Sequence, residues 1–289
     1  MMKIKENKEE ILVWYWGNGR EILNFGEHLV EILIEEFGYK PRIYSDAKNN
    51  GDLKNYESCL VVVGSELNKG LVDRIETPKL LVWGQGKGHG EYFDINDPHY
   101  AKKVDIRAVR GPHTIRQLNL NPDIPLGDPG FLLPLLFPME KNKSLCKIIY
   151  MPHHSNRNNI NDKLRNLGAE KYIDIMFKKE EFWNKLKELI SAKFVLTSSL
   201  HTAIVAHAYN VPWALCLVNG ESLNFPDKWR DLFEYLGIYN NFKIVKNYKE
   251  GLDWWKKVGS KAKIPSLTPL INSFPYQVRN SKIKEISHK

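Results

Sequence analysis

The sequence predicts an α/β protein with two domains, each a parallel sheet with helices on its faces. Short apolar runs alternate with amphipathic segments along most of the 289 residues, which is typical of strand–helix–strand units. The alternation is interrupted at residues 134–143, a stretch rich in proline and lysine, and then starts again. We therefore place a domain boundary there and expect domains at residues 1–140 and 141–289.

In the first half, five apolar runs predict strands and two segments predict helices. The helix expected at Phe25–Phe37 has its apolar residues on one face. The helix expected at Pro112–Leu118 begins with proline, where the missing amide hydrogen costs nothing. The expected strands are Ile11–Trp16, Arg42–Tyr44, Cys59–Gly64, Leu80–Gly84 and Ile106–Val109.

The second half repeats this pattern. The expected strands are Lys147–Met151, Tyr172–Met176, Phe194–Leu196 and Trp213–Val218, and the expected helices are Asn161–Leu167, Glu180–Ser191, Leu200–Ala208 and Lys228–Leu236. Two stacked Rossmann-like halves are the simplest architecture. Open parallel sheets bind ligands beyond the carboxyl ends of their strands, so the cleft between the halves is the expected site. We expect Pro265–Lys289 to pack back on the first domain and to fray beyond Arg279.

Composition and charge exclude several classes of protein. The three cysteines are isolated, which argues against a disulfide framework or a structural zinc site. No apolar run approaches the ~18 residues of a membrane span, and the charged N-terminus lacks a signal region, so we expect a cytoplasmic protein. The net charge of +8 suits an anionic substrate or an anionic membrane face. No nucleic-acid-binding signature is present, and we expect no such partner.

Two glycine-rich loops follow strands of the first half. Trp16-Gly17-Asn18-Gly19 leads to Asn24-Phe25-Gly26-Glu27-His28 at a helix start, where backbone amides and the helix dipole favour an anion. The second loop carries Lys87 and His89 among the glycines at 84, 86, 88 and 90. Neither loop matches a dinucleotide-binding or P-loop fingerprint, so a structural turn and a flexible linker remain the alternatives.

Arg110 and Asp128 lie at turns that follow predicted strands. Arg110 precedes Gly111-Pro112, where a guanidinium suits bidentate binding of carboxylate or phosphate. Asp128 precedes a proline and either orients a basic group or closes a turn, and we favour the turn.

Three histidines near strand ends are further candidates. Thr197, Ser198 and Ser199 end a strand and cap an apolar helix that must be buried, with His201 in its first turn facing the cleft. His207, further along this helix, is expected to be a packed residue. His153 and His154 follow another strand, and because no third ligand is near, anion contact is as good an interpretation as metal binding.

Several motifs occur together in this order. They are Asn24-Phe25-Gly26-Glu27, Arg110-Gly111-Pro112, Leu126-Gly127-Asp128-Pro129 and Ser199-Leu200-His201, the last followed by Ala206 and Val211-Pro212-Trp213. Over roughly residues 10–240 this set resembles the polysaccharide pyruvyl transferase family. Pro152-His153-His154 and Lys228-Trp229-Arg230-Asp231 resemble the branch that decorates bacterial exopolysaccharides and capsules. The chain departs from the family pattern at Ser199, where many members carry arginine, and at Glu27, where aspartate is usual.

The resemblance implies a glycosyltransferase-B-like fold and transfer of an enolpyruvyl unit from phosphoenolpyruvate to a sugar, forming a cyclic ketal without cofactor or metal. It implies catalytic roles for His201 and Arg110. The donor-binding residues would be Arg110, His153, His154, Ser198, Ser199 and His201, and the acceptor-binding residues Asn24, Gly26, Glu27, Gly84, Lys87 and His89. The implied acceptor is a sugar of a bacterial surface polysaccharide or of its lipid-linked precursor, reached by peripheral contact with the inner face of the cytoplasmic membrane.

Two other functions remain open on the sequence. A nucleotide-sugar glycosyltransferase would have the same architecture, although no clear ribose-binding carboxylate follows a glycine-rich loop in the second half. A non-catalytic protein that binds sugars or anions is favoured by Ser199 in place of arginine. The acceptor sugar, the bridged hydroxyls and the oligomeric state are left open by the sequence.

Overall fold

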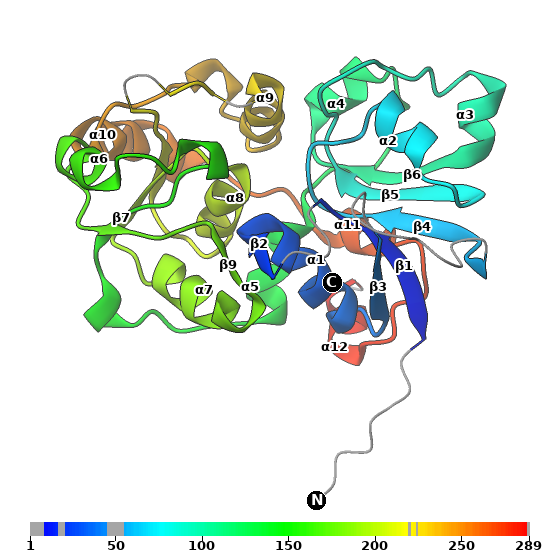
Figure 1. Ribbon diagram of the computed structural model, residues 1–289, viewed down its shortest axis with the longest axis horizontal. Helices are drawn as coiled ribbons and strands as arrows, with labels where there is room; N and C mark the ends of the chain where they lie inside the picture. Colours follow the sequence, from blue (N-terminus) through cyan, green and yellow to red (C-terminus); the bar gives the residue numbers. More distant parts are fainter. Residues whose placement is uncertain (1–8, 17–20, 45–54, 219–220, 224, 288–289) are drawn as a thin grey trace, which may run out of the picture.

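Two parallel sheets organise the protein (Figure 1). The computed structural model describes residues 9–16, 21–44, 55–218, 221–223 and 225–287. The first sheet has the strand order β3-β1-β4-β5-β6, and all of its pairings are parallel. Its strands are β1 (Glu10–Trp14), β3 (Lys40–Tyr44), β4 (Ser58–Val61), β5 (Lys79–Gln85) and β6 (Val104–Val109).

The second sheet is formed by the later half of the chain and has the order β11-β10-β7-β8, again parallel. Its strands are β7 (Ile148–Tyr150), β8 (Lys171–Tyr172), β10 (Phe194–Thr197) and β11 (Trp213–Leu215). The α/β class that the sequence pattern predicts is therefore confirmed, with one parallel sheet in each half.

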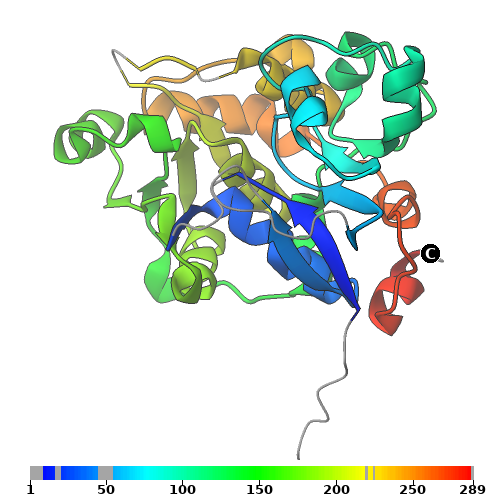
Figure 2. The same cartoon turned by 45° about the vertical axis from the view of Figure 1, so that its right-hand side comes forward.

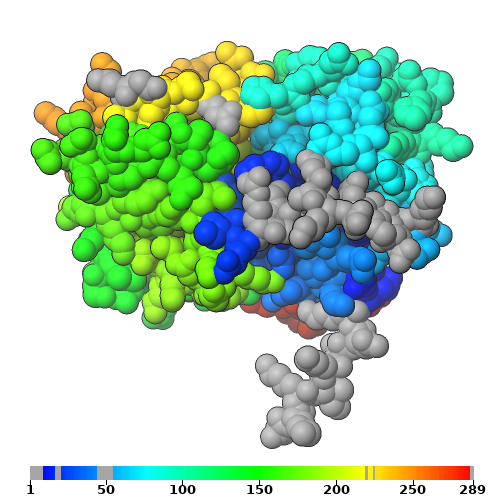
Figure 3. Space-filling view, viewed as in Figure 1, coloured from blue at the N-terminus to red at the C-terminus, as the bar shows by residue number. Residues whose placement is uncertain are grey.

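A short antiparallel pair joins the halves. Strand β2 (Ile22–Asn24) pairs with β9 (Met176–Lys178), and Figure 3 shows the dark-blue residues of the first half against the green surface of the second. The single strand expected at Tyr172–Met176 is therefore wrong, because β8 and β9 belong to different sheets. The Asp174 side chain accepts a hydrogen bond from the Met176 amide (2.9 Å), which turns the chain between them.

Helices cover the sheets and connect their strands. They are α1 (Phe25–Glu36), α2 (Lys69–Arg74), α3 (Pro98–Lys103), α4 (Pro112–Gln117), α5 (Leu133–Leu136), α6 (Ile160–Leu167), α7 (Phe182–Ile190), α8 (Leu200–Ala208), α9 (Pro226–Tyr235), α10 (Tyr248–Lys257), α11 (Thr268–Asn272) and α12 (Ser281–Ser287). Every residue of α8 except His201 is buried, as its apolar sequence predicts. None of the described helices has the length and apolar character that a bilayer crossing requires.

The C-terminal segment returns to the first sheet, where α11 and α12 lie beside it in both views (Figures 1 and 2). The Trp83 indole donates a hydrogen bond to the Leu270 carbonyl (2.8 Å), and the Arg279 amide donates to the Phe37 carbonyl (3.1 Å). The expected fraying beyond Arg279 is wrong, because α12 follows it and its Ile283 is buried. An apolar contact of this kind anchors a terminal helix.

Candidate functional site

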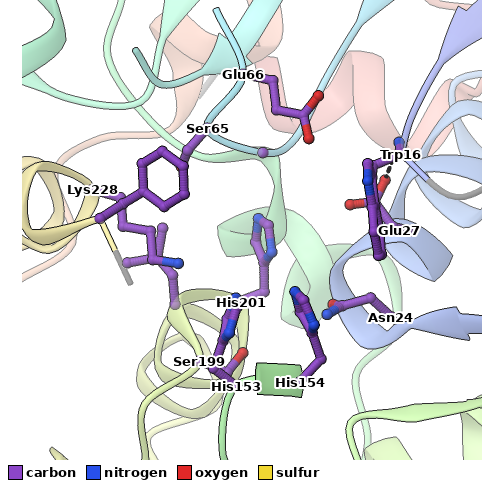
Figure 4. Close-up of a pocket in the computed structure, with 13 residues that line it drawn as sticks. Trp16, Asn24, Glu27, Ser65, Glu66, His153, His154, Ser199, His201 and Lys228 are labelled. Atoms are coloured by element: carbon purple, nitrogen blue, oxygen red, sulfur yellow. Dashed lines mark hydrogen bonds between the residues drawn. The ribbon is translucent and has the colours of Figure 1, made fainter. Parts of the chain in front are cut away.

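A cavity of about 310 Å³ lies where the two halves face each other (Figure 4). Most of its lining comes from loops that follow β1, β4, β7 and β10, so it occupies the carboxyl ends of both parallel sheets, the usual ligand-binding edge. The described residues that line it are Trp16, Asn24, Glu27, Gly64, Ser65, Glu66, His153, His154, Ser199, Leu200, His201, Phe225 and Lys228.

His201 reaches the cavity from the first turn of α8. Ser199 caps this helix by accepting a hydrogen bond from the Thr202 amide (3.5 Å). The His201 Nε2 atom lies 3.6 Å from Asp128 Oδ2, and Asp128 is completely buried. Asp128 Oδ1 accepts from the Gly130 amide (2.9 Å), so this carboxylate closes a turn, and its Oδ2 faces the His201 ring without a hydrogen bond to it. The turn that the sequence favoured for Asp128 is therefore confirmed.

Gly26 allows the histidine to take this position. A Cβ atom added at Gly26 would overlap the His201 ring, with Nδ1 as its nearest atom. The Gly26 amide donates to the side chain of Asn24 (2.9 Å), which caps α1. The first turns of α1 and α8, one from each half, thus pack against each other at the His201 ring.

The first half gives the cavity an acidic wall. Glu27 Oε2 accepts a hydrogen bond from the Trp16 amide (3.1 Å). Burial and then the neighbouring Glu66 carboxylate raise the pKa of Glu27 well above its usual value. A carboxyl group whose pKa is raised in this way keeps its proton to higher pH than an exposed glutamate does, and is suited to proton transfer.

The second half gives the cavity a basic and aromatic wall. The His153 amide donates to Ser198 Oγ (3.0 Å), and the His154 ring stacks on Trp16 at 5.4 Å between centroids. Burial and then the Lys228 charge lower the pKa of His153 to about 3, so this ring is neutral at pH 7. Burial and then the Arg110 guanidinium lower the pKa of Lys228 to about 7.

Arg110 lies behind this wall and is almost completely buried, with 1% of its surface exposed. Its Nη1 donates to the Gly64 carbonyl (3.0 Å) and to Ser65 Oγ (2.7 Å), and its Nε lies 3.3 Å from Asp231 Oδ2. The guanidinium therefore supports the loop after β4 and is neutralised by a carboxylate of α9.

Comparison with known protein families shows the family of this chain. The model of the family described as polysaccharide pyruvyl transferase matches residues 5–220, about three quarters of the chain. The chain belongs to the polysaccharide pyruvyl transferase family. The resemblance carried by the sequence motifs is thereby confirmed.

Individual relatives of this pyruvyl transferase family member are distant. The succinoglycan biosynthesis protein ExoV of Rhizobium meliloti is 30% identical over 183 residues, which are 63% of this chain and 55% of that protein. The uncharacterised protein L143 of Acanthamoeba polyphaga mimivirus is 26% identical over 140 residues, 47% of this chain and 48% of that protein. The chain thus spans about half the length of the curated relatives it matches.

A solved structure of a functionally uncharacterised protein from Klebsiella pneumoniae is also similar. It is 16% identical, with a TM-score of 0.45 over 82% of this chain and 93% of that one.

The cavity brings together about half of the residues that the sequence and the family resemblance single out. Six of them line it, two from the proposed acceptor side and four from the proposed donor side: Asn24, Glu27, His153, His154, Ser199 and His201. Gly26 lies directly against the His201 ring. His207 is a packed residue, as predicted, and accepts a hydrogen bond from the Trp213 indole (3.2 Å).

The other predicted residues are not among the described residues that line the cavity. Arg110 and Ser198 lie just behind it, and Ser198 Oγ accepts from the His153 amide. Gly84 has a left-handed backbone (φ +85°) and packs on Pro129. Lys87 places its ammonium 3.8 Å from the centre of the Tyr92 ring.

His89, at the end of the same loop, contacts the ring of Phe225, and its carbonyl accepts from the Asn68 side chain (2.6 Å). The glycine loop expected at residues 17–19 falls outside the residues that the structure describes.

Sequence reasoning gave no site role to Trp16, Glu66, Lys228 or Asp231, which the structure places at or beside the cavity. Lys228 and Asp231 lie about one helical turn apart, and the sequence indicated them only as members of a motif that resembles the family. Glu66 had no signal beyond its place after a predicted strand. Among the described residues, no group of three or more histidine, cysteine, aspartate or glutamate side chains is arranged to hold a metal ion.

Proposed function

We propose that this protein transfers an enolpyruvyl unit from phosphoenolpyruvate to a sugar and closes it to a pyruvate ketal. Membership of the polysaccharide pyruvyl transferase family supports the reaction class. The observation that carries the assignment is the division of the cavity into a basic wall, with His201 and Lys228, and an acidic wall, with Glu27 and Glu66.

This division suits the two substrates. Phosphoenolpyruvate is small and strongly anionic, and the N-terminal turns of α8 and α9 and the cationic groups of the second half offer it complementary charge. A sugar is neutral and rich in hydroxyl groups, which carboxylates and amides such as Glu27 and Asn24 bind through hydrogen bonds. We therefore assign the donor to the second half and the acceptor to the first.

The reaction balances with these groups. A proton adds to the methylene carbon of the donor, and a sugar hydroxyl oxygen bonds to the adjacent carbon and loses its proton. The second hydroxyl oxygen then bonds to the same carbon and loses its proton, while the bond between that carbon and the phosphate oxygen breaks. This releases the ketal and inorganic phosphate, which takes up the proton. We assign His201, whose ring faces Asp128, to proton transfer at the donor and Glu27 to proton transfer at an acceptor hydroxyl. Arg110 acts as a positioning residue, through Ser65 and Asp231.

The acceptor that we propose is a lipid-linked oligosaccharide of a bacterial surface polysaccharide. The similarity to a succinoglycan biosynthesis protein supports a polysaccharide precursor. The net charge of +8 supports peripheral contact with an anionic membrane face, where each lysine or arginine near the surface contributes about 1 kcal/mol. Two parallel sheets with a cavity between them fit a glycosyltransferase-B arrangement.

The test is turnover with phosphoenolpyruvate and a panel of oligosaccharide acceptors. We expect phosphate release that depends on the acceptor and a product heavier by one C₃H₂O₂ unit. His201→Ala should slow this release about 10²–10⁴-fold, the usual contribution of a general acid or base. Transfer of a sugar from a nucleotide sugar would replace the proposal with a glycosyltransferase function, and binding of both substrates without turnover would support a non-catalytic protein.

A further inference from the structure

Two buried cations lie beside the cavity, and their surroundings differ. Arg110 has the Asp231 carboxylate beside it, 3.3 Å from Nε, and its Nη1 donates hydrogen bonds to Gly64 and Ser65. The Asp231 carboxylate is also fully used, because it accepts from the amide of Thr114 (3.0 Å) and from its hydroxyl (2.7 Å). The charge of Arg110 is therefore compensated by a carboxylate within the protein.

Lys228 has no such compensation. Only 7% of its surface is exposed, and no hydrogen bond or ion pair of the described residues involves its ammonium group. The Lys228 Nζ atom lies 5.6 Å from the centre of the Phe225 ring. An ammonium ion buried without a partner is costly, and this cost lowers its pKa. An anion placed beside the ammonium group would offset this cost.

The surroundings of Lys228 define where that anion would lie. Of the described residues that line the cavity, Lys228 alone is a lysine or arginine. Figure 4 shows its ammonium end directed toward the space around His201, away from Glu27 and Glu66. It stands in the first turn of α9, which has ten residues, and His201 stands in the first turn of α8, which has nine. Both helix ends carry partial positive charge.

We propose that Lys228 binds the phosphate group of the donor, between the N-terminal turns of α8 and α9. This inference rests on the proposed function and adds a residue to it. A phosphate dianion supplies enough oxygen atoms for the ammonium group and for the amides at a helix N-terminus at once, which a single carboxylate does less well. The neutral His153 beside it contributes a hydrogen bond and no competing charge.

The experiment measures binding of inorganic phosphate, phosphoenolpyruvate and pyruvate to four proteins by calorimetry. They are the wild type, Lys228→Met, Lys228→Arg and the matched control Arg230→Met, which removes one exposed positive charge from the same helix. Lys228→Met should weaken phosphate and phosphoenolpyruvate binding at least about tenfold and leave pyruvate binding unchanged. Lys228→Arg should recover most of the affinity, and Arg230→Met should bind as the wild type does.

The outcomes separate this inference from the function on which it rests. Wild-type binding of phosphoenolpyruvate that Lys228→Met leaves unchanged would overturn the role of Lys228 alone. A wild type that binds neither phosphate nor phosphoenolpyruvate would overturn the proposed function together with it. Misfolding is checked by the melting temperature without ligand, which should be equal to or higher than that of the wild type because the variant removes a buried unpaired charge. Equal weakening of pyruvate binding would assign the donor carboxylate to Lys228 and contradict the proposal.

Discussion

The two halves of this protein build their ligand-binding edges in the same way and give them opposite charge. In each half the loops that follow parallel strands converge on the cavity. The first half places Glu27 and Glu66 there, and the second places His201 and Lys228. The carboxyl end of a parallel sheet can therefore suit an anionic donor or a hydroxylic acceptor, depending on which side chains follow the strands.

A second contrast lies within the basic side. Arg110 and Lys228 are both buried, yet only Arg110 has a carboxylate partner. The paired cation holds structure together, whereas the unpaired one is a source of instability that a ligand relieves. This distinction can be tested by removing the partner of one cation and the charge of the other.

The largest effect is expected at the paired cation. Asp231→Ala leaves the Arg110 guanidinium buried and uncompensated, and should lower the free energy of unfolding by about 3–5 kcal/mol. Urea denaturation at pH 7 measures this. As a matched comparison, Asp227→Ala removes an exposed carboxylate from the same helix and should cost less than about 1 kcal/mol. Similar costs for both variants would mean that Arg110 does not depend on Asp231.

The contact between the two walls is tested at Gly26. Gly26→Ala places a Cβ against the His201 ring, and should cost about 1–3 kcal/mol of stability and displace the imidazole from Asp128. Pyruvyl transfer should fall with it. Gly70→Ala, in α2, is the control, because its nearest neighbour would be the side-chain oxygen of Asn68 at 3.3 Å. Full activity in Gly26→Ala would show that the ring is free to move.

The unpaired ammonium group of Lys228 should make the stability of the protein depend on pH. The pKa of Lys228 is about 7 when folded and ordinary, near 10.5, when unfolded, so unfolding takes up a proton between these values. The free energy of unfolding should rise with pH through this window, by an amount on the order of 2 kcal/mol between pH 7 and 9. Lys228→Met should lose this part of the rise. Identical pH profiles for the two proteins would show that the ammonium group is not destabilised by burial.

The smallest effect is expected on the acidic wall. Glu66→Gln removes a carboxylate that raises the pKa of Glu27, so this pKa should fall. Burial, the larger cause, remains. Because the proposed reaction needs the ionised Glu27 carboxylate to accept the proton of the sugar hydroxyl, the acidic limb of the pH–rate profile should move to lower pH, and a limb that stays in place would exclude this role. Glu57→Gln, an exposed carboxylate in the same half, serves as the control.

The sequence predicted those parts of the fold that depend on local pattern. Buried parallel strands appear in a sequence as runs of apolar residues, so the main strands of both sheets could be predicted. Strands β2 and β9 have three residues each and are stabilised by pairing with each other, across 150 residues of chain, which no local pattern records. Helix α12 was missed because its apolar contacts come only from Ile283, which is buried, and Ile286, which is partly buried, among mostly polar and charged neighbours.

Prediction of the site followed the same division. His201 and Glu27 were found because they stand in the first turns of helices that follow strands. The ion pair between the buried Arg110 and Asp231 could not be predicted, because the two residues lie 121 positions apart and meet only in the folded protein. Lys228 was hidden for the opposite reason, because the absence of a partner is a property of the three-dimensional surroundings.

The most direct test of the central claim is a crystal structure of the protein with phosphoenolpyruvate bound. We expect the donor phosphate to lie within hydrogen-bonding distance of Lys228 Nζ and near the N-terminal turn of α8. The methylene carbon should face His201, and Arg110 should remain paired with Asp231. Phosphate density beside Glu27 and Glu66, or on a rearranged Arg110, would contradict the division of the cavity into a donor wall and an acceptor wall.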